Sequence, residues 1–314
     1  MYLVEDLLAQ HGDRLSLKVI AGAQGLSRQI KVPEAQRPGL SLSGYLKNHA
    51  HKRILIFGKV ETNFIRDLDP KVRTKRLESL ISEDTPAVVI ARGYAPPKEL
   101  SQLCEEKGLP LLRTQLSTMN ILTKLIVLLH NEFAPTISCH GTLVEVFGVG
   151  VLIQGESAVG KSEAALGLIE RGHRLISDDI VKVKKRDDNY LEGSGAELTK
   201  HHLEIRGIGI INVANLYGVV CVREHKSIDI VVQLELWDDL HFYDRVGVED
   251  KTTTILGHEL PFHVLPVKPG RDVVLLLETI ARNHRLRKMG YNSAKEFQAK
   301  LTETISRQAK GAKR

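Results

Sequence analysis

The sequence is poor in cysteine and has no long hydrophobic run. Its 314 residues include three cysteines, Cys104, Cys139 and Cys221, which are odd in number and widely spaced. This number and spacing support neither a disulfide framework nor a zinc pattern, and they favour buried or partly buried thiols. No apolar segment is long enough to span a bilayer, and the first residues lack the basic start and apolar stretch of a secretory signal. We therefore expect a cytoplasmic protein without a membrane partner.

The net charge of +6 is unevenly distributed along the chain. Residues 1–132 carry 19 basic and 14 acidic groups, residues 133–281 carry 15 and 22, and residues 282–314 carry 10 and 2. The acidic middle segment argues against a general DNA-binding face. The basic end is explained equally well by an element for an acidic partner and by a solvated helix face.

Alternating strand and helix patterns predict a small α/β domain over residues 1–132. Apolar, partly β-branched runs at 53–59, 87–93 and 110–115 read as strands. Helical spacing separates or follows them at 63–81, 97–107 and 118–133. Strands that alternate with helices indicate a parallel sheet.

Residues 133–314 predict a second, strand-rich α/β domain that ends in helices. Segments 137–147 and 149–154 read as a hairpin. A short helix at 163–171 follows, and then extended runs at 173–176, 204–213, 218–222, 227–236, 252–256 and 258–266. Asp272 is suited to cap a helix that runs to Met289, and Ser293 with Glu296 forms a capping box for the last helix. This composition indicates a sheet more mixed than in a doubly wound nucleotide-binding fold.

A complete G-x-x-x-x-G-K-[ST] motif follows the second strand of the hairpin and precedes the short helix. Backbone N–H groups of such a loop and the positive end of the helix dipole bind phosphate. Lys161 would reach the outer phosphates, and the Ser162 hydroxyl is a natural Mg²⁺ ligand. The predicted nucleotide-binding residues are Gly155, Glu156, Ser157, Ala158, Val159, Gly160, Lys161 and Ser162.

Two adjacent carboxylates, Asp178 and Asp179, lie 17 and 18 residues beyond Lys161, at the expected end of a strand. Alternation across a strand would turn one toward Mg²⁺ and the other toward an incoming hydroxyl. We assign Asp179 as the group that accepts the hydroxyl proton and Asp178 as metal or orienting support, although the reverse order stays open. His140, at the start of the hairpin, is suited to hold one carboxylate as an ion pair, and a structural role is equally compatible with its position.

Basic and acidic residues farther along the chain could complete a phosphoryl-transfer site. Glu204 is a candidate second metal contact, and Arg206 a phosphate clamp. Arg245 could neutralise charge on the moving phosphoryl group. The turn that contains Lys268, Pro269, Gly270 and Arg271 could close over phosphate. Taken singly, each basic residue could also be merely solvated.

Taken together, His140, the loop at 155–162, Ser177-Asp178-Asp179, the run at 203–212, Arg245 and the stretch at 266–271 resemble bacterial HPr kinase/phosphorylase. Residues 33–45 resemble the start of that family's N-terminal domain, which is similar to a domain of muramyl ligases. The kinase domain of the family resembles that of phosphoenolpyruvate carboxykinase.

The resemblance implies a bifunctional regulator of carbon metabolism. Such enzymes phosphorylate a serine of the phosphocarrier HPr with ATP or pyrophosphate and Mg²⁺, and reverse the reaction with inorganic phosphate to give pyrophosphate. The resemblance also implies that the stretch at 266–271 takes part in dephosphorylation. Members are typically homohexamers that respond to fructose 1,6-bisphosphate.

Two other functions remain open at the level of the sequence. One is a small-molecule kinase on the same loop, and the other is a nucleotide-responsive transcription regulator whose basic tail binds DNA. The absence of a recognisable helix-turn-helix argues against the regulator.

Overall fold

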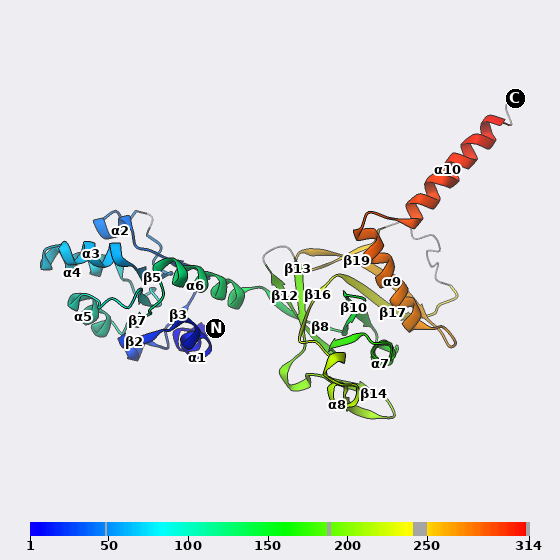
Figure 1. The fold of residues 1–314 in the computed structure, drawn as a ribbon, viewed down its shortest axis with the longest axis horizontal. Coiled ribbons are helices and arrows are strands. Elements are labelled where there is room, and N and C mark those ends of the chain that lie inside the picture. The colour runs from blue at the N-terminus through cyan, green and yellow to red at the C-terminus, as the bar shows by residue number, and fades with distance from the viewer. Residues whose placement is uncertain (48, 187–189, 241–249, 312–314) are drawn as a thin grey trace. The chain divides into compact units, whose positions relative to one another are not determined.

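The computed structural model describes residues 1–47, 49–186, 190–240 and 250–311, with side chains of the last helix only as far as residue 304. The chain divides into two compact units, Met1–Ala134 and Pro135–Arg314, which are described separately. Figure 1 shows their helices and strands.

The first unit is a parallel sheet with helices on both faces. Its five-stranded sheet has the order β2-β7-β6-β5-β4, in which β4 to β7 run parallel and β2 is an antiparallel edge strand. The elements are β1 (Tyr2–Leu3), α1 (Val4–Leu15), β2 (Lys18–Ala21), η1 (Ala23–Gly25), β3 (Gln29–Ile30), β4 (Ala35–Gln36), α2 (Leu40–Ser43), β5 (Ile54–Phe57), α3 (Lys59–Asp67), α4 (Pro70–Leu80), β6 (Val88–Ile90), α5 (Lys98–Glu106), β7 (Leu111–Arg113) and α6 (Thr118–Phe133).

Alternation along the central strands explains the two covered faces. Ile54 and Ile56 of β5 join a core that includes α1 and α6, whereas Leu55 and Phe57 of the same strand join a core with α3, α4 and α5. Successive side chains of a strand point to opposite faces, so a strand buried on both sides reads as a continuous apolar run. The α/β fold predicted for this part of the chain is confirmed.

The second unit is rich in strands. A six-stranded mixed sheet has the order β11-β9-β10-β17-β19-β18, a four-stranded sheet the order β16-β13-β12-β8, and β14 pairs with β15. The elements are β8 (Thr136–His140), β9 (Thr142–Val146), β10 (Val149–Gly155), α7 (Lys161–Glu170), β11 (Arg174–Ser177), β12 (Ile180–Arg186), β13 (Tyr190–Ser194), η2 (Glu197–Thr199), β14 (His202–Ile205), β15 (Gly209–Asn212), α8 (Val213–Tyr217), η3 (Val219–Cys221), β16 (His225–Ile228), β17 (Ile230–Leu236), β18 (Thr252–Ile255), β19 (His258–Val267), α9 (Val273–Lys288) and α10 (Ser293–Gly311).

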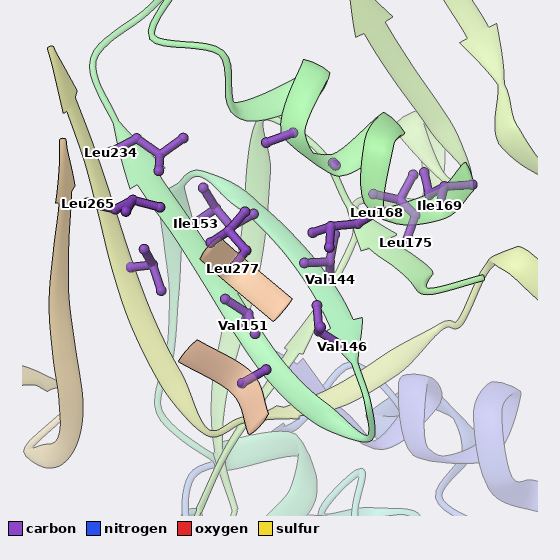
Figure 2. Packing of buried hydrophobic residues seen from close by; sticks show 14 of the residues in the cluster. Val144, Val146, Val151, Ile153, Leu168, Ile169, Leu175, Leu234, Leu265 and Leu277 are labelled. Atoms are coloured by element: carbon purple, nitrogen blue, oxygen red, sulfur yellow. The ribbon is translucent and has the colours of Figure 1, made fainter. Parts of the chain in front are cut away.

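Two cores lie on opposite faces of the six-stranded sheet. On one face, Val151 and Ile153 of β10 pack with Leu168 of α7 and Leu277 of α9, as Figure 2 shows. On the other face, Leu152 packs with residues of the four-stranded sheet. β10, β17 and β19 run parallel, so their carboxyl ends meet at one edge of the sheet. The mixed, strand-rich character predicted for this unit is confirmed.

Several predicted elements have different bounds, and each difference has a local cause. The single helix predicted at 63–81 is two helices, because Asp69 caps α4 and Pro70 occupies its first position. The strand predicted at 218–222 is wrong, since a short 3₁₀ helix occupies 219–221 after Gly218 turns the chain at φ 93°. The capping box predicted from Ser293 is also wrong, because the carboxamide oxygen of Asn292 accepts hydrogen bonds from the first N–H groups of α10.

Three further features concern the length of the helices and the burial of cysteine and apolar side chains. Within the residues that the structure describes, none of the helices has the length and apolar character needed to cross a bilayer. Cys104 is buried and Cys139 and Cys221 are partly buried, as predicted. Phe297 and Leu301 of α10 are exposed.

Candidate active site

The phosphate-binding motif forms the connection between β10 and α7. Gly155 ends β10 at a point where an added Cβ would lie 2.5 Å from the carbonyl oxygen of Leu234 on β17, so only glycine fits this approach. Gly160 caps α7 with φ 99°, a left-handed conformation that favours glycine. The first N–H groups of a helix have no partner within the helix and are available to an anion. The sequence therefore builds a loop that is suited to hold phosphate at the carboxyl edge of the sheet.

Lys161 is largely buried and folds back over the loop. Its ammonium group donates hydrogen bonds to the carbonyl oxygens of Gly155 and Glu156, at 2.9 and 2.8 Å. These carbonyls hold the ammonium at the loop, where a short rotation of a flexible side chain would bring it to a phosphate oxygen.

A cleft of about 430 Å³ opens beside the loop. Glu156, Ser157, Ala158 and Val159 line it on the side of the loop. The opposite side comes from the end of β17 and the residues that follow: Gln233, Leu234, Glu235, Leu236 and Asp238. A cleft at the carboxyl ends of parallel strands is the usual ligand position in open α/β sheets.

Asp178 and Asp179 lie in a tight turn between β11 and β12, and not on a strand as predicted. The N–H of Ile180 donates to the carbonyl oxygen of Asp178 at 2.8 Å, and Asp179 has φ 66°. A non-glycine residue in this left-handed region is strained, and such strain is concentrated at functional sites. The turn, and not strand alternation, sends the two carboxylates in different directions.

Asp178 points inward and accepts several hydrogen bonds. The Ser162 hydroxyl donates to its carboxylate at 2.9 Å, the Thr142 hydroxyl at 2.6 Å, and the backbone N–H of Glu204 at 3.3 Å. Asp178 is only 7% exposed. Charged groups at this depth need such partners, because an unsatisfied buried charge is costly.

Asp179 points outward and meets His140. The side chain of Asp179 is 68% exposed, and its carboxylate oxygen lies 3.3 Å from Nδ1 of His140. His140 ends β8, which pairs with β12 in the four-stranded sheet, so its predicted place on the hairpin is wrong. Gly141, with φ 154°, separates β8 from β9, and the hairpin consists of β9 and β10. His140 therefore approaches Asp179 across a strand pair.

The predicted strand at 204–213 is a small hairpin whose turn faces the loop. Gly207 and Gly209, both with positive φ, turn the chain between β14 and β15. Arg206 lies in this turn, and its guanidinium donates to the Ser157 hydroxyl at 3.3 Å. Glu204 is exposed on β14, and it is its backbone N–H that contacts Asp178. The structure thus brings Arg206 to the phosphate loop and Glu204 beside Asp178.

The turn at 268–271 lies at the same sheet edge as the phosphate loop. The turn follows β19, and within it the backbone N–H of Arg271 donates to the carbonyl oxygen of Lys268 at 3.1 Å. Pro269 and Gly270, the latter with φ 81°, occupy the central positions of this turn. Arg245 lies outside the residues that the structure describes.

Three side chains near the loop and the cleft were not predicted from the sequence. Thr142 begins β9 and is fully buried, and only its contact with Asp178 reveals it. Trp237 follows β17, and Asp238 lines the cleft.

A cysteine nucleophile is not supported, because burial raises the pKa of the Cys139 thiol next to His140 and keeps it protonated at neutral pH.

Models of two domains match almost the whole chain. The HPr Serine kinase N terminus matches residues 3–129, and the HPr Serine kinase C-terminal domain matches residues 131–301. The chain belongs to the HPr serine kinase family. Its division into an N-terminal and a C-terminal part is the architecture of that family's two models.

Members of the HPr serine kinase family are similar to this chain over nearly its full length. HPr kinase/phosphorylase of Exiguobacterium sp. is 44% identical over 297 residues, which cover 95% of this chain and 96% of the relative. HPr kinase/phosphorylase of Bacillus subtilis is 41% identical over 93% of this chain and 94% of its own. The solved HPr(Ser) kinase/phosphatase of Coxiella burnetii is 36% identical and matches 51% of this chain and 98% of its own, with a TM-score of 0.47.

Proposed function

We propose that this chain is a bifunctional kinase and phosphorylase of a serine on HPr. Family membership supports the proposal, because the relatives are named HPr kinase/phosphorylase. The observation in the site that carries it is the turn at 178–179. There one carboxylate lies inward on Ser162 of the phosphate loop and the other lies outward, where a protein hydroxyl can approach.

Mg²⁺ fits the oxygen donors at the inner end of this turn. The Ser162 hydroxyl and the Asp178 carboxylate lie 2.9 Å apart. Mg²⁺ takes oxygen ligands and usually keeps few protein contacts alongside waters and substrate phosphates. Bound there, the ion would neutralise charge on the phosphate oxygens. We retain Glu204 as a candidate outer contact.

In the kinase direction, Asp179 accepts the proton of the HPr serine hydroxyl. The serine oxygen bonds to the terminal phosphorus of the donor, and the bond from that phosphorus to the bridging oxygen breaks. Lys161 exchanges the loop carbonyls for phosphate oxygens, and Arg206 contributes positive charge beside Ser157. His140, whose Nδ1 lies 3.3 Å from the carboxylate of Asp179, holds that carboxylate in orientation toward the incoming hydroxyl.

In the reverse direction, an oxygen of inorganic phosphate bonds to the phosphorus of phosphoserine. The bond from phosphorus to the serine oxygen breaks, and protonated Asp179 returns its proton to that oxygen. The products are the HPr serine and pyrophosphate. We assign the phosphate to Lys268 and Arg271, which lie at the same edge as the loop, and keep Arg245 as a candidate third cation.

The size of the cleft favours ATP as a donor. A volume of about 430 Å³ extends past the phosphate loop along Gln233, Glu235 and Asp238, which offer acceptors to nucleoside hydroxyl and amino groups. Pyrophosphate would occupy only the part at the loop. A homohexamer, a response to fructose 1,6-bisphosphate and a role in carbon metabolism are proposed from the family resemblance.

The function is tested with purified chain, HPr, Mg²⁺ and ATP labelled at the γ-phosphate. We expect label on an HPr serine, and after an excess of inorganic phosphate we expect the label in pyrophosphate. Label that never reaches HPr would refute the kinase, and label released as inorganic phosphate would refute the phosphorylase. Salt-sensitive binding to DNA without transfer would favour a transcription regulator instead.

A further inference from the structure

A single aromatic ring lies against both cations of the turn at 268–271. Nζ of Lys268 lies 4.4 Å from the ring centroid of Trp237, and Cζ of Arg271 lies 5.8 Å from it. Both distances are within the range in which the negative face of an indole attracts a cation. Trp237 is 37% exposed, so the residue packs partly against protein and stays partly accessible to solvent.

Backbone pairing brings these residues together. β17 and β19 run parallel with Leu236 opposite Val267, and the N–H of Trp237 continues the ladder by donating to the carbonyl oxygen of Val267 at 2.9 Å. The guanidinium of Arg271 donates to the carbonyl oxygen of Pro266 at 2.9 Å. The strand register and the turn therefore direct both cationic side chains back toward the residue that follows β17.

The ring itself is held in orientation. The indole N–H of Trp237 donates to a carboxylate oxygen of Asp239 at 2.7 Å. Asp238, which directly follows Trp237 in the chain, lines the cleft beside the phosphate loop. Two like charges on one short turn repel each other, and the attraction of each cation to the same indole ring offsets part of that repulsion. The ring thus keeps two positive charges close to it, at the sheet edge that carries the proposed phosphate-binding loop.

We propose that Trp237 is a positioning residue that holds Lys268 and Arg271 ready for inorganic phosphate in the phosphorylase direction. The inference rests on the proposed function. Loss of Trp237 should therefore affect the phosphorylase direction selectively, because in the kinase direction the phosphoryl group arrives on the donor and no separate inorganic phosphate is bound. A ring that only packs on the turn would affect folding and both directions alike.

The test compares Trp237→Leu with Trp237→Phe in the full-length chain. Leucine keeps apolar surface and removes the aromatic face, whereas phenylalanine keeps an aromatic face. For Trp237→Leu we expect the KM for inorganic phosphate to rise by about tenfold, with kinase-direction kcat and KM and the thermal midpoint close to wild type. Trp237→Phe should restore most of the affinity. Tyr190→Leu, on β13 of the other sheet, is the matched control for loss of a half-exposed aromatic.

Titration of inorganic phosphate followed by ³¹P NMR separates this inference from the proposed function. Wild type that binds phosphate more tightly than Trp237→Leu, yet forms no pyrophosphate, would refute the phosphorylase while the positioning role stands. Equal phosphate affinity in wild type and Trp237→Leu would overturn the positioning role. Losses of equal size in both reaction directions, with a lowered thermal midpoint, would overturn it as well.

Discussion

The hydroxyl of Thr142 should contribute more to the stability of the fold than its position at the start of a strand suggests. Thr142 is fully buried, and its hydroxyl donates to Asp178 at 2.6 Å. Thr142→Val keeps the shape and removes the donor, so a buried carboxylate loses one of its partners. Hydrogen bonds to charged groups contribute about 1.5–3 kcal/mol. We therefore expect the free energy of unfolding of the second unit to fall by about 2 kcal/mol, which lowers its thermal midpoint by about 4–8 °C.

The same change should weaken Mg²⁺ binding at the proposed site on Ser162 and Asp178. With one hydrogen bond fewer, the Asp178 carboxylate is less fixed beside Ser162, and we expect the Mg²⁺ concentration for half-maximal nucleotide binding to rise by about tenfold. Calorimetry and nucleotide titrations at several Mg²⁺ concentrations measure the two effects.

Thr62→Val in the first unit is the matched control. Thr62 is 1% exposed, and its hydroxyl has no hydrogen-bond partner among the residues that the structure describes. Removing a buried hydroxyl that lacks a partner should leave stability unchanged or raise it slightly. Equal effects of the two substitutions on the thermal midpoints would refute the reasoning about Asp178.

Two further predictions concern pH and phosphate. Burial, aided by the charge of Lys288, lowers the pKa of His284 in the folded state, so below about pH 6.5 the unfolded chain binds more protons and stability falls on acidification. In denaturant titrations between about pH 7 and 5, His284→Leu should make the free energy of unfolding depend less on pH. An unchanged pH dependence would show that His284 is not its source. Arg271→Ala should raise the KM for inorganic phosphate by about tenfold or more and affect the kinase direction less, and equal losses would remove the proposed division of labour.

Much of the fold was predictable because it depends on local patterns. The runs around 54–57 and 88–90 are apolar at every position, as strands buried on both faces must be, and the helix at 118–133 has the bounds that its sequence spacing predicts. The phosphate loop was predictable because its glycines, lysine and serine have fixed roles in a single connection.

The remainder of the site depends on contacts between distant segments. No local pattern shows that Asp179 adopts a positive φ, or that Gly141 sends His140 into a different sheet from Thr142. The approach of Trp237 to Lys268 follows from the parallel register of β17 and β19, which the sequence does not specify. The single strand predicted at 204–213 was wrong because the chain turns at Gly207 and pairs with itself as the hairpin of β14 and β15.

The central claim is that the two neighbouring carboxylates divide the chemistry, with Asp178 beside the metal ligand and Asp179 as the acceptor of the serine proton. The most direct measurement is the effect of Asp179→Asn on nucleotide affinity and on phosphoryl transfer in both directions. The account predicts nucleotide affinity within about twofold of wild type, with both transfer rates lower by about 100-fold or more. Transfer at a rate near that of wild type would contradict it.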